Sequence, residues 1–214
     1  VPNASRSKAG SVSASSRGYA NGKTFALEPL PGTGGGVHAG RGFGGTGAPH
    51  GSPIHPVAAG SGAEGSWVSS SPGGGAIHIA ALSGVVIDGS VLSNGFGRGA
   101  GGSVFLEAAG LAGGGRVEAQ GGARAGGGRI ALVADSISEE LVVRTSARGG
   151  LTTPSDAGGA AGTVYLRDAA SIFGTLIVDN AGSATNTTTE LVPIGTGVVE
   201  SVDAAGFTAV AAEF

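Results

Sequence analysis

The stretch that decides the fold is residues 126–133, which read Gly-Gly-Gly-Arg-Ile-Ala-Leu-Val. After the three glycines, Ile130 and Leu132 alternate with Arg129 and Ala131. A period of two is typical of a β-strand that buries one face. Runs of the same kind recur along the chain, in Ala76–Ala80, Ser103–Glu107 and Thr163–Arg167.

These runs are regularly spaced, because their starts are 27, 26 and 34 residues apart. A second series keeps the same step, with spacings of 26, 26 and 34: Ser90–Ser93, Arg116–Ala119, Val142–Thr145 and Leu176–Asp179. The shared jump to 34 indicates one insertion of about eight residues, placed at Leu151 to Asp156. A unit of this length cannot bury its apolar face alone, so we expect stacked copies that share one core.

A third, shorter apolar piece lies between the two runs of each unit: Val85-Val86-Ile87, Leu111, Ile137 and Ile172-Phe173. Three pieces per unit predict a coil with three faces. The glycine clusters, such as 73–75, 113–115 and 126–128, suit tight corners or close backbone approach. The sequence therefore predicts an all-β fold: a single-stranded right-handed parallel β-helix, or β-solenoid, of four or five coils with negligible helix.

We expect one domain over residues 1–214. Residues 1–18 hold an early strand at Ser11–Ser15, and residues 19–72 form a long Gly/Pro/His-rich insertion or cap. Regular coils occupy residues 73–182. Residues 183–214 supply C-terminal strands or a cap, with Leu191-Val192 and Val198-Val199 as a candidate strand pair.

The pattern resembles the glycine-rich β-helix repeats of large bacterial, algal and viral surface proteins of adhesin or filament type. The stretches that carry this resemblance cover most of the chain: Ser11–Tyr19, Gly36–Gly42, Gly73–Ile79, Gly126–Leu132, Gly162–Leu166 and Leu176–Asn180. The resemblance implies an extracellular scaffold without assigned catalytic residues. The chain lacks a long repeat array, so it is interpreted as one module of something larger.

Composition favours architecture over chemistry. Glycine accounts for 45 of 214 residues, charged residues for 13% and aromatic residues for 5%, and the formal net charge is −3. The twelve Lys and Arg residues do not form a basic run, which argues against nucleic acid as a partner. Cysteine is absent, so disulfides and thiolate metal sites are excluded. No apolar stretch approaches the length needed to span a bilayer, so membrane insertion is not expected.

Parallel β-helices also carry polysaccharide-cleaving enzymes, which need convergent carboxylates on neighbouring coils. The acids associated with the strands occur at differing phases of the repeat, which argues against an enzyme: Asp88, Glu107, Glu118, Asp135, Asp168 and Asp179. We assign no catalytic, cofactor-binding or metal-binding residue, and no ligand-binding residue. No cofactor is expected.

Histidines and aromatic residues offer weaker candidates. His38, His50 and His55 lie in the long insertion, where three imidazoles could bind zinc or copper, but their spacing fits no short metal motif and pinning of backbone carbonyls is preferred. His78 is expected to point outward into solvent. The aromatic residues outside the strands could stack on sugar rings or cover the ends of the fold: Tyr19, Phe43, Trp67 and Phe96.

From the sequence we expect a secreted or cell-surface, noncatalytic structural or adhesive module. Its coil ends would pair with neighbouring copies or domains, giving a filament or stalk. A carbohydrate-binding module and a polysaccharide-active enzyme remain the alternatives.

Overall fold

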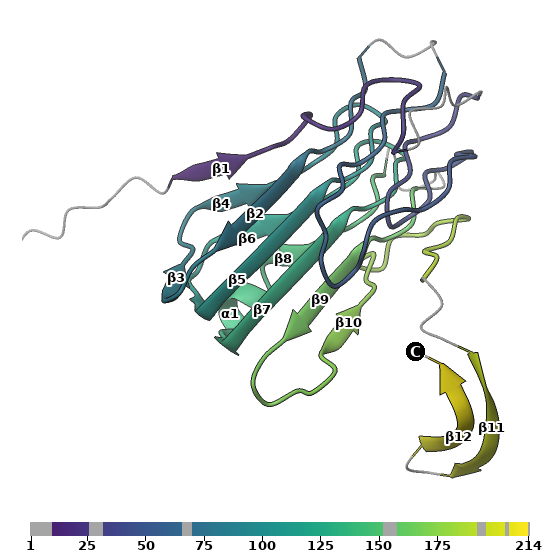
Figure 1. Ribbon diagram of the computed structural model, residues 1–214. Coiled ribbons are helices and arrows are strands. Elements are labelled where there is room, and N and C mark those ends of the chain that lie inside the picture. The colour runs from purple at the N-terminus through teal and green to yellow at the C-terminus, as the bar shows by residue number, and fades with distance from the viewer. Residues whose placement is uncertain are drawn as a thin grey trace, which may run out of the picture.

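The computed structural model describes residues 10–25, 32–65, 70–151, 158–191, 196–203 and 206–213. Within these ranges the chain forms two sheets and a separate hairpin, and Figure 1 shows the four-stranded sheet behind the six-stranded one. The larger sheet has the strand order β10-β9-β7-β5-β2, with β3 also paired to β5, and the smaller has the order β1-β4-β6-β8. The strands of the larger sheet are β2 (Ala76–Ala80), β3 (Gly84–Val86), β5 (Ser103–Ala112), β7 (Arg129–Ile137), β9 (Thr163–Arg167) and β10 (Thr175–Ile177).

The smaller sheet consists of β1 (Ser11–Ser13), β4 (Ser90–Leu92), β6 (Arg116–Glu118) and β8 (Thr145–Ser146). Its strands are all parallel, and β1 lies beside β4, where the sequence placed an early strand. The hairpin pairs β11 (Thr196–Asp203) with β12 (Gly206–Glu213) in antiparallel register. Val198-Val199 therefore belongs to a terminal strand pair with β12, whereas Val192 of the other candidate strand lies outside the described residues.

The register predicted for the first series is confirmed. Ile77 lies opposite Val104, Val104 opposite Ile130, and Ile130 opposite Val164, all in parallel pairs. These aliphatic side chains share one core with Val91 and Val117 of the smaller sheet. The two sheets are therefore joined through a single apolar interior, whose burial favours the folded state.

The prediction for the second series is correct only for its first two members. Val117 lies opposite Thr145 and not Val143, because the short helix α1 (Glu139–Val142) takes up the intervening residues. Ser138 caps this helix by accepting a hydrogen bond from the Leu141 amide on its side-chain oxygen, and two glutamates follow in the first turn. The capping sequence therefore favours a helix here, although Val142 and Val143 are residues typical of a strand.

The fourth member of the second series is also placed wrongly. Leu176 lies in β10, which pairs antiparallel with β9 instead of extending the smaller sheet. The reversal occurs at Gly174, which has a φ of +76°, and the Tyr165 hydroxyl donates to the Phe173 carbonyl across the turn at 2.8 Å. Ile172 and Phe173, expected to supply an interior face, are instead 86% and 87% exposed.

The prediction of a single-stranded right-handed parallel β-helix is therefore wrong. The third apolar piece does not form its own face, because Val85, Leu111 and Ile137 pair within the same sheet as the first series. The structure has two sheets that do not close into a solenoid, and the larger one contains an antiparallel strand. What the sequence did predict is a β-rich chain with almost no helix.

Extended glycine-rich segments complete the fold beside the starts of β2, β5, β7 and β9. The described part of residues 19–72 contains no named strand, yet it is interleaved with these segments. The Gly36 amide donates to the Arg98 carbonyl at 2.7 Å, and the Gly126 amide donates to the Gly36 carbonyl at 3.0 Å. Val37, His38 and Ala39 are fully buried between them. In this packing, backbone lies directly against backbone.

Candidate functional site

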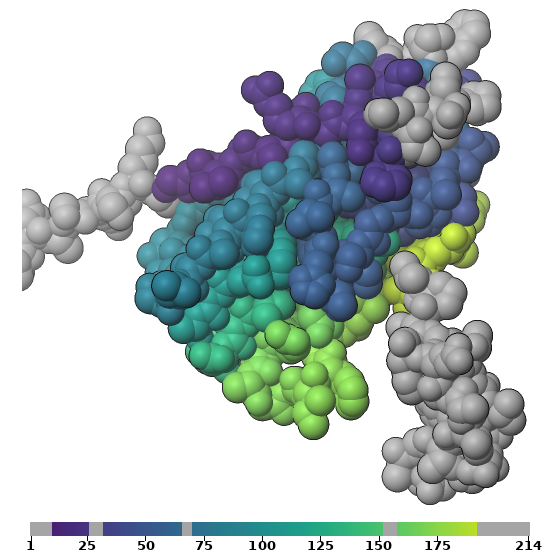
Figure 2. Space-filling model, viewed as in Figure 1, coloured from purple at the N-terminus to yellow at the C-terminus, as the bar shows by residue number. Residues whose placement is uncertain are grey.

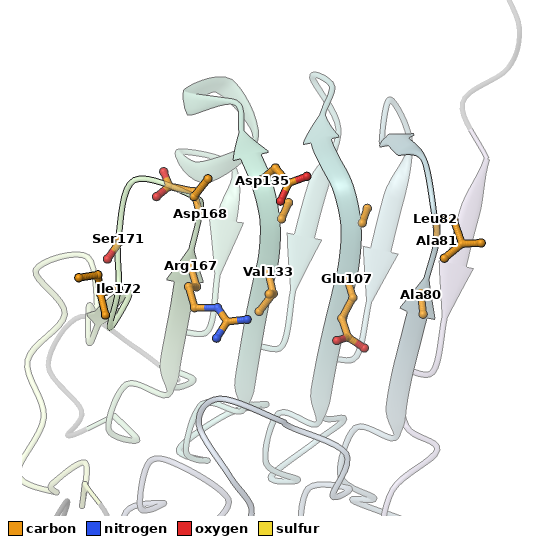
Figure 3. Close-up of a pocket in the computed structure, with 13 residues that line it drawn as sticks. Ala80, Ala81, Leu82, Glu107, Val133, Asp135, Arg167, Asp168, Ser171 and Ile172 are labelled. Atoms are coloured by element: carbon orange, nitrogen blue, oxygen red, sulfur yellow. The ribbon is translucent and has the colours of Figure 1, made fainter.

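The outward face of the larger sheet carries the polar side chains that strand alternation directs away from the core. Val104 and Leu106 are buried in the interior cluster, so Phe105 and Glu107 point to the other face. The parallel register then aligns Ala80, Glu107, Val133 and Arg167 in one row across four strands. Figure 3 shows this row, with Asp135 and Asp168 further along the strands.

An open groove of about 620 Å³ runs over this face. Its polar lining comes from β5, β7 and β9 and from the turn that follows β9: Glu107, Asp135, Arg167, Asp168 and Ser171. Small apolar residues, including Ala80 and Ala108, also line it. The lining offers three carboxylates, one guanidinium and one hydroxyl, which suits a ligand rich in hydroxyl groups.

His78 contacts Glu107 beside the groove. His78 Nε2 lies 2.7 Å from Glu107 Oε1, with both side chains about half exposed, and the His78 ring stacks on Phe105 at a centroid distance of 4.7 Å. His78 points outward, as the sequence predicted, but it is a paired and stacked side chain. Phe105 and Tyr165 themselves are almost fully buried, so neither presents a free ring face to the groove.

The structure brings together three of the six acids that sequence reasoning placed at differing phases. Glu107, Asp135 and Asp168 line the one groove. The other three lie elsewhere, since Glu118 pairs with Arg116 and accepts a hydrogen bond from Asn94, while Asp88 and Asp179 line separate small hollows. Among the described residues, no group of three His, Cys, Asp or Glu side chains could hold a metal ion.

A second cluster lies beneath the segment that crosses the start of the sheet. His38 is fully buried, its Nδ1 donates to the Gly101 carbonyl at 2.8 Å, and its ring lies 4.7 Å from that of His50. His50 donates from Nε2 to the Ala59 carbonyl at 2.9 Å. Two of the three insertion histidines thus bond backbone carbonyls, whereas His55 lies edge-on to Phe105.

Arg129 belongs to the same buried cluster, although it comes from β7. It is 1% exposed, its Nε donates to the His50 carbonyl at 2.8 Å, and its Nη1 donates to the Thr163 hydroxyl at 3.3 Å. Burial lowers the pKa of Arg129 to about 10, so it remains a cation at neutral pH. Within the described residues, Arg129 Nη2 and His38 Nε2 are buried without a hydrogen-bond partner.

Burial and positive charge both act on the two histidines. Burial lowers the pKa of His38 well below 6.5, and the neighbouring His50 and Arg129 lower it further. Burial also lowers the pKa of His50, against the opposing effect of the Ala59 and Ala48 carbonyls. Both rings therefore favour the neutral state in the folded protein.

The aromatic candidates do not form one platform. Tyr19 lies edge-on to His50, Phe43 lies under the Arg124 guanidinium at 5.3 Å, and Phe96 is 58% exposed. Trp67 lies outside the described residues.

Sequence reasoning missed Arg167 and Arg129. Both follow from the confirmed register: Arg167 stands two positions after the outward Tyr165, and Arg129 stands two positions before the outward Ala131. No sequence pattern predicts that the segment around His50 covers one end of the outward face and leaves the other end open (Figure 2).

No protein-family model, curated protein or solved structure gives a significant match to this chain. In the part of the chain that the structure describes, no helix is long and apolar enough to cross a membrane.

Proposed function

We propose that this chain is a noncatalytic structural or adhesive module of an extracellular surface assembly, and that it joins a second copy through the outer edges of β1 and β2. The observation that carries the proposal is the position of these two strands. Each is the last strand of its sheet at the same end of the molecule (Figure 1). Unpaired backbone groups at a sheet edge favour pairing with another strand.

The ladder identifies which backbone groups are available on β2. The Ser103 amide donates to the Gly75 carbonyl and the Ala81 amide donates to the Glu107 carbonyl, so odd-numbered residues of β2 bond β5. The amides of Ala76, His78 and Ala80 therefore face away from the sheet. On β1, the Ala14 amide donates to the Leu92 carbonyl, which by the same alternation directs the Ser11 and Ser13 amides outward.

Exposed apolar side chains accompany this edge. Val12 on β1 is 51% exposed, Leu82 just after β2 is fully exposed, and Val86 on β3 is 69% exposed. Burial of these side chains against a second copy would add apolar contact to strand pairing. The opposite end of the larger sheet carries the antiparallel β10, so the two ends are not equivalent. A two-fold pair formed through equivalent β1 and β2 edges fits this asymmetry better than continuous stacking.

Sedimentation velocity over a range of concentrations tests this function. The wild-type chain should associate as concentration rises, and a Ser11→Pro/Ala80→Pro variant should stay monomeric, because proline removes an outward amide without removing a ladder bond. The matched control is Ser11→Ala/Ala80→Ser, which retains both amides and should associate like the wild type. A Val12→Lys/Leu82→Lys variant tests the same edge through side chains alone. A wild-type monomer at all concentrations, or proline and control variants that associate equally, would refute the proposal.

A second function, glycan binding, is favoured by the groove. A carboxylate and a guanidinium in one row can bond several hydroxyl groups of a saccharide. Glu107 on β5 and Arg167 on β9 are separated by two strand spacings of about 4.8 Å each. Binding to a glycan array should be lost in Arg167→Ala and kept in Arg98→Ala, whose guanidinium lies outside the groove and bonds the Thr33 carbonyl. A wild-type chain that binds no glycan on the array would exclude this second function.

A further inference from the structure

Residues 47–59, called the lid here, cross the outward face of the larger sheet beside the groove. The Ser103 hydroxyl donates to the Ala58 carbonyl at 2.6 Å, Arg129 Nε donates to the His50 carbonyl at 2.8 Å, and the His55 ring lies edge-on to Phe105 at 5.5 Å. The lid therefore covers the outward residues at the start of β5, β7 and β9, including Thr163, while Glu107 and Arg167 stay in the open groove.

The lid is attached through histidines rather than through apolar anchors alone. The His50 amide donates to the His38 carbonyl at 3.0 Å, and His50 Nε2 donates to the Ala59 carbonyl, which closes the lid on itself. The His50 ring also stacks on Phe25 at 5.5 Å. Because His38 Nδ1 donates to a carbonyl, its neutral form leaves an acceptor lone pair on the buried, unpartnered Nε2.

The charged groups around this pair disfavour a further positive charge. His50 and Arg129 act on His38, and Arg129 also acts on His50, in each case through positive charge. Glu64 holds one end of the lid, where its carboxylate accepts from the Gly47 amide at 2.8 Å and from Thr46. Arg41 donates to the Gly47 carbonyl at the same end and pairs with Glu190, while Glu107 is paired with His78. A proton on either ring would thus join a buried cluster that already contains the Arg129 cation.

We propose that the lid is an acid-released cover: protonation of His38 and His50 detaches residues 47–59 from the sheet and lengthens the groove over Phe105, Arg129 and Thr163. Release is local, because the β5–β7 ladder lies behind the lid and keeps its own register. The opened face would add the Arg129 guanidinium and the hydroxyls of Ser103 and Thr163 to the carboxylates already in the groove. The lid would then control access to this face by pH, independently of assembly through the β1 and β2 edges.

Residue-resolved amide exchange at about pH 7.5 and about pH 5, corrected for the intrinsic rate, tests the proposal. Protection of the His50 amide should fall at least about tenfold at the lower pH and recover on neutralisation, while the β5 and β7 amides stay protected. A His38→Asn/His50→Gln variant, neutral at every pH, places amide donors near the positions of Nδ1 and Nε2 and should lose this response. The control His78→Gln removes a histidine that lies outside the lid and should respond like the wild type.

The exchange experiment would overturn the proposal if it showed unchanged His50 protection at low pH, an equal loss in the His38→Asn/His50→Gln variant, or simultaneous loss of protection in the β5–β7 ladder. Should the double variant not fold, the single His50→Gln variant should show a smaller loss of protection than the wild type, and an equal loss would overturn the proposal. In addition, NMR titration of the ring protons of the wild type should show His38 and His50 gaining protons over the same pH range in which lid signals change. Titration of the rings without any change in the lid would also refute it.

Discussion

Substitution of Gly127 by alanine should be among the most damaging single-methyl changes in this protein. Gly127 lies in the glycine-rich segment before β7, where its amide donates to the Ala160 carbonyl at 2.9 Å and its carbonyl accepts from the Gly40 amide at 3.1 Å. A Cβ at this position would overlap the carbonyl oxygen of Ala147 and the amide nitrogen of Gly162. Both are backbone atoms, which cannot rotate aside as a side chain could.

The magnitude follows from the contacts that must separate. Overpacking of an interior costs about 1–3 kcal/mol, and each backbone hydrogen bond that lengthens adds about 1 kcal/mol. With bonds to the Ala160 and Gly40 segments both affected, we expect Gly127→Ala to lower the free energy of unfolding by about 3–5 kcal/mol. That is a large part of the stability of an ordinary domain.

Urea denaturation followed by circular dichroism measures this effect, and Gly84→Ala is the matched control. A Cβ at Gly84 in β3 meets nothing closer than the Gly110 carbonyl oxygen, at 3.8 Å. Alanine at this position should leave stability within about 1 kcal/mol of the wild type, with a tendency to stabilise. If Gly127→Ala cost no more than Gly84→Ala, the close packing of backbone segments described above would be incorrect.

Three further predictions concern the core, the turn after β9 and pH. Ile130→Ala, at a fully buried position in the central ladder, should lower the free energy of unfolding by about 2–5 kcal/mol in the same denaturation assay, whereas Val143→Ala, 72% exposed, should have little effect. Tyr165→Phe removes the hydrogen bond to the Phe173 carbonyl and should lower the free energy of unfolding by about 1 kcal/mol. Amide exchange should become faster in the turn before β10 and not in β5, and an exchange rate in that turn equal to the wild type would contradict this role. Because the folded-state pKa values of His38 and His50 are lowered, the unfolded chain binds more protons than the folded chain below about pH 6.5. The free energy of unfolding should therefore fall as pH drops from that value, by at most about 1.4 kcal/mol per pH unit for each histidine. A thermal midpoint that rises over that range in the wild type, or falls equally in the His38→Asn/His50→Gln variant, would contradict this sign.

The first series of strands was predictable because its alternation and its spacing are both local signals. Ile77, Val104, Ile130 and Val164 fall in one row because a one-residue slip would turn the aliphatic side chains away from the core. Spacing alone failed at Val143, where a serine cap and two glutamates form α1, and at Leu176, where a turn at Gly174 reverses the chain. The helix cap and the turn decide the topology, and neither can be inferred from a repeat length.

The candidate site was less accessible to sequence reasoning. Glu107, Asp135 and Asp168 are 28 and 33 residues apart, and they share a groove only because β5, β7 and the end of β9 lie side by side. The contact between His38 and His50 depends on how the segment of residues 19–72 packs between glycine-rich neighbours, for which no periodic pattern exists. Register could be inferred from the sequence, whereas the packing of irregular backbone could not.

Pairing at the edge of β2 is tested most directly by the exchange rates of the Ala76, His78 and Ala80 amides, measured by NMR at low and high protein concentration. These amides face away from β5, so they should exchange quickly in dilute solution and become protected as the chain associates, while the Ile77 and Ile79 amides, which bond β5, should be protected at both concentrations. Rapid exchange of the three outward amides at a concentration where the sedimenting mass has risen would contradict assembly through this edge.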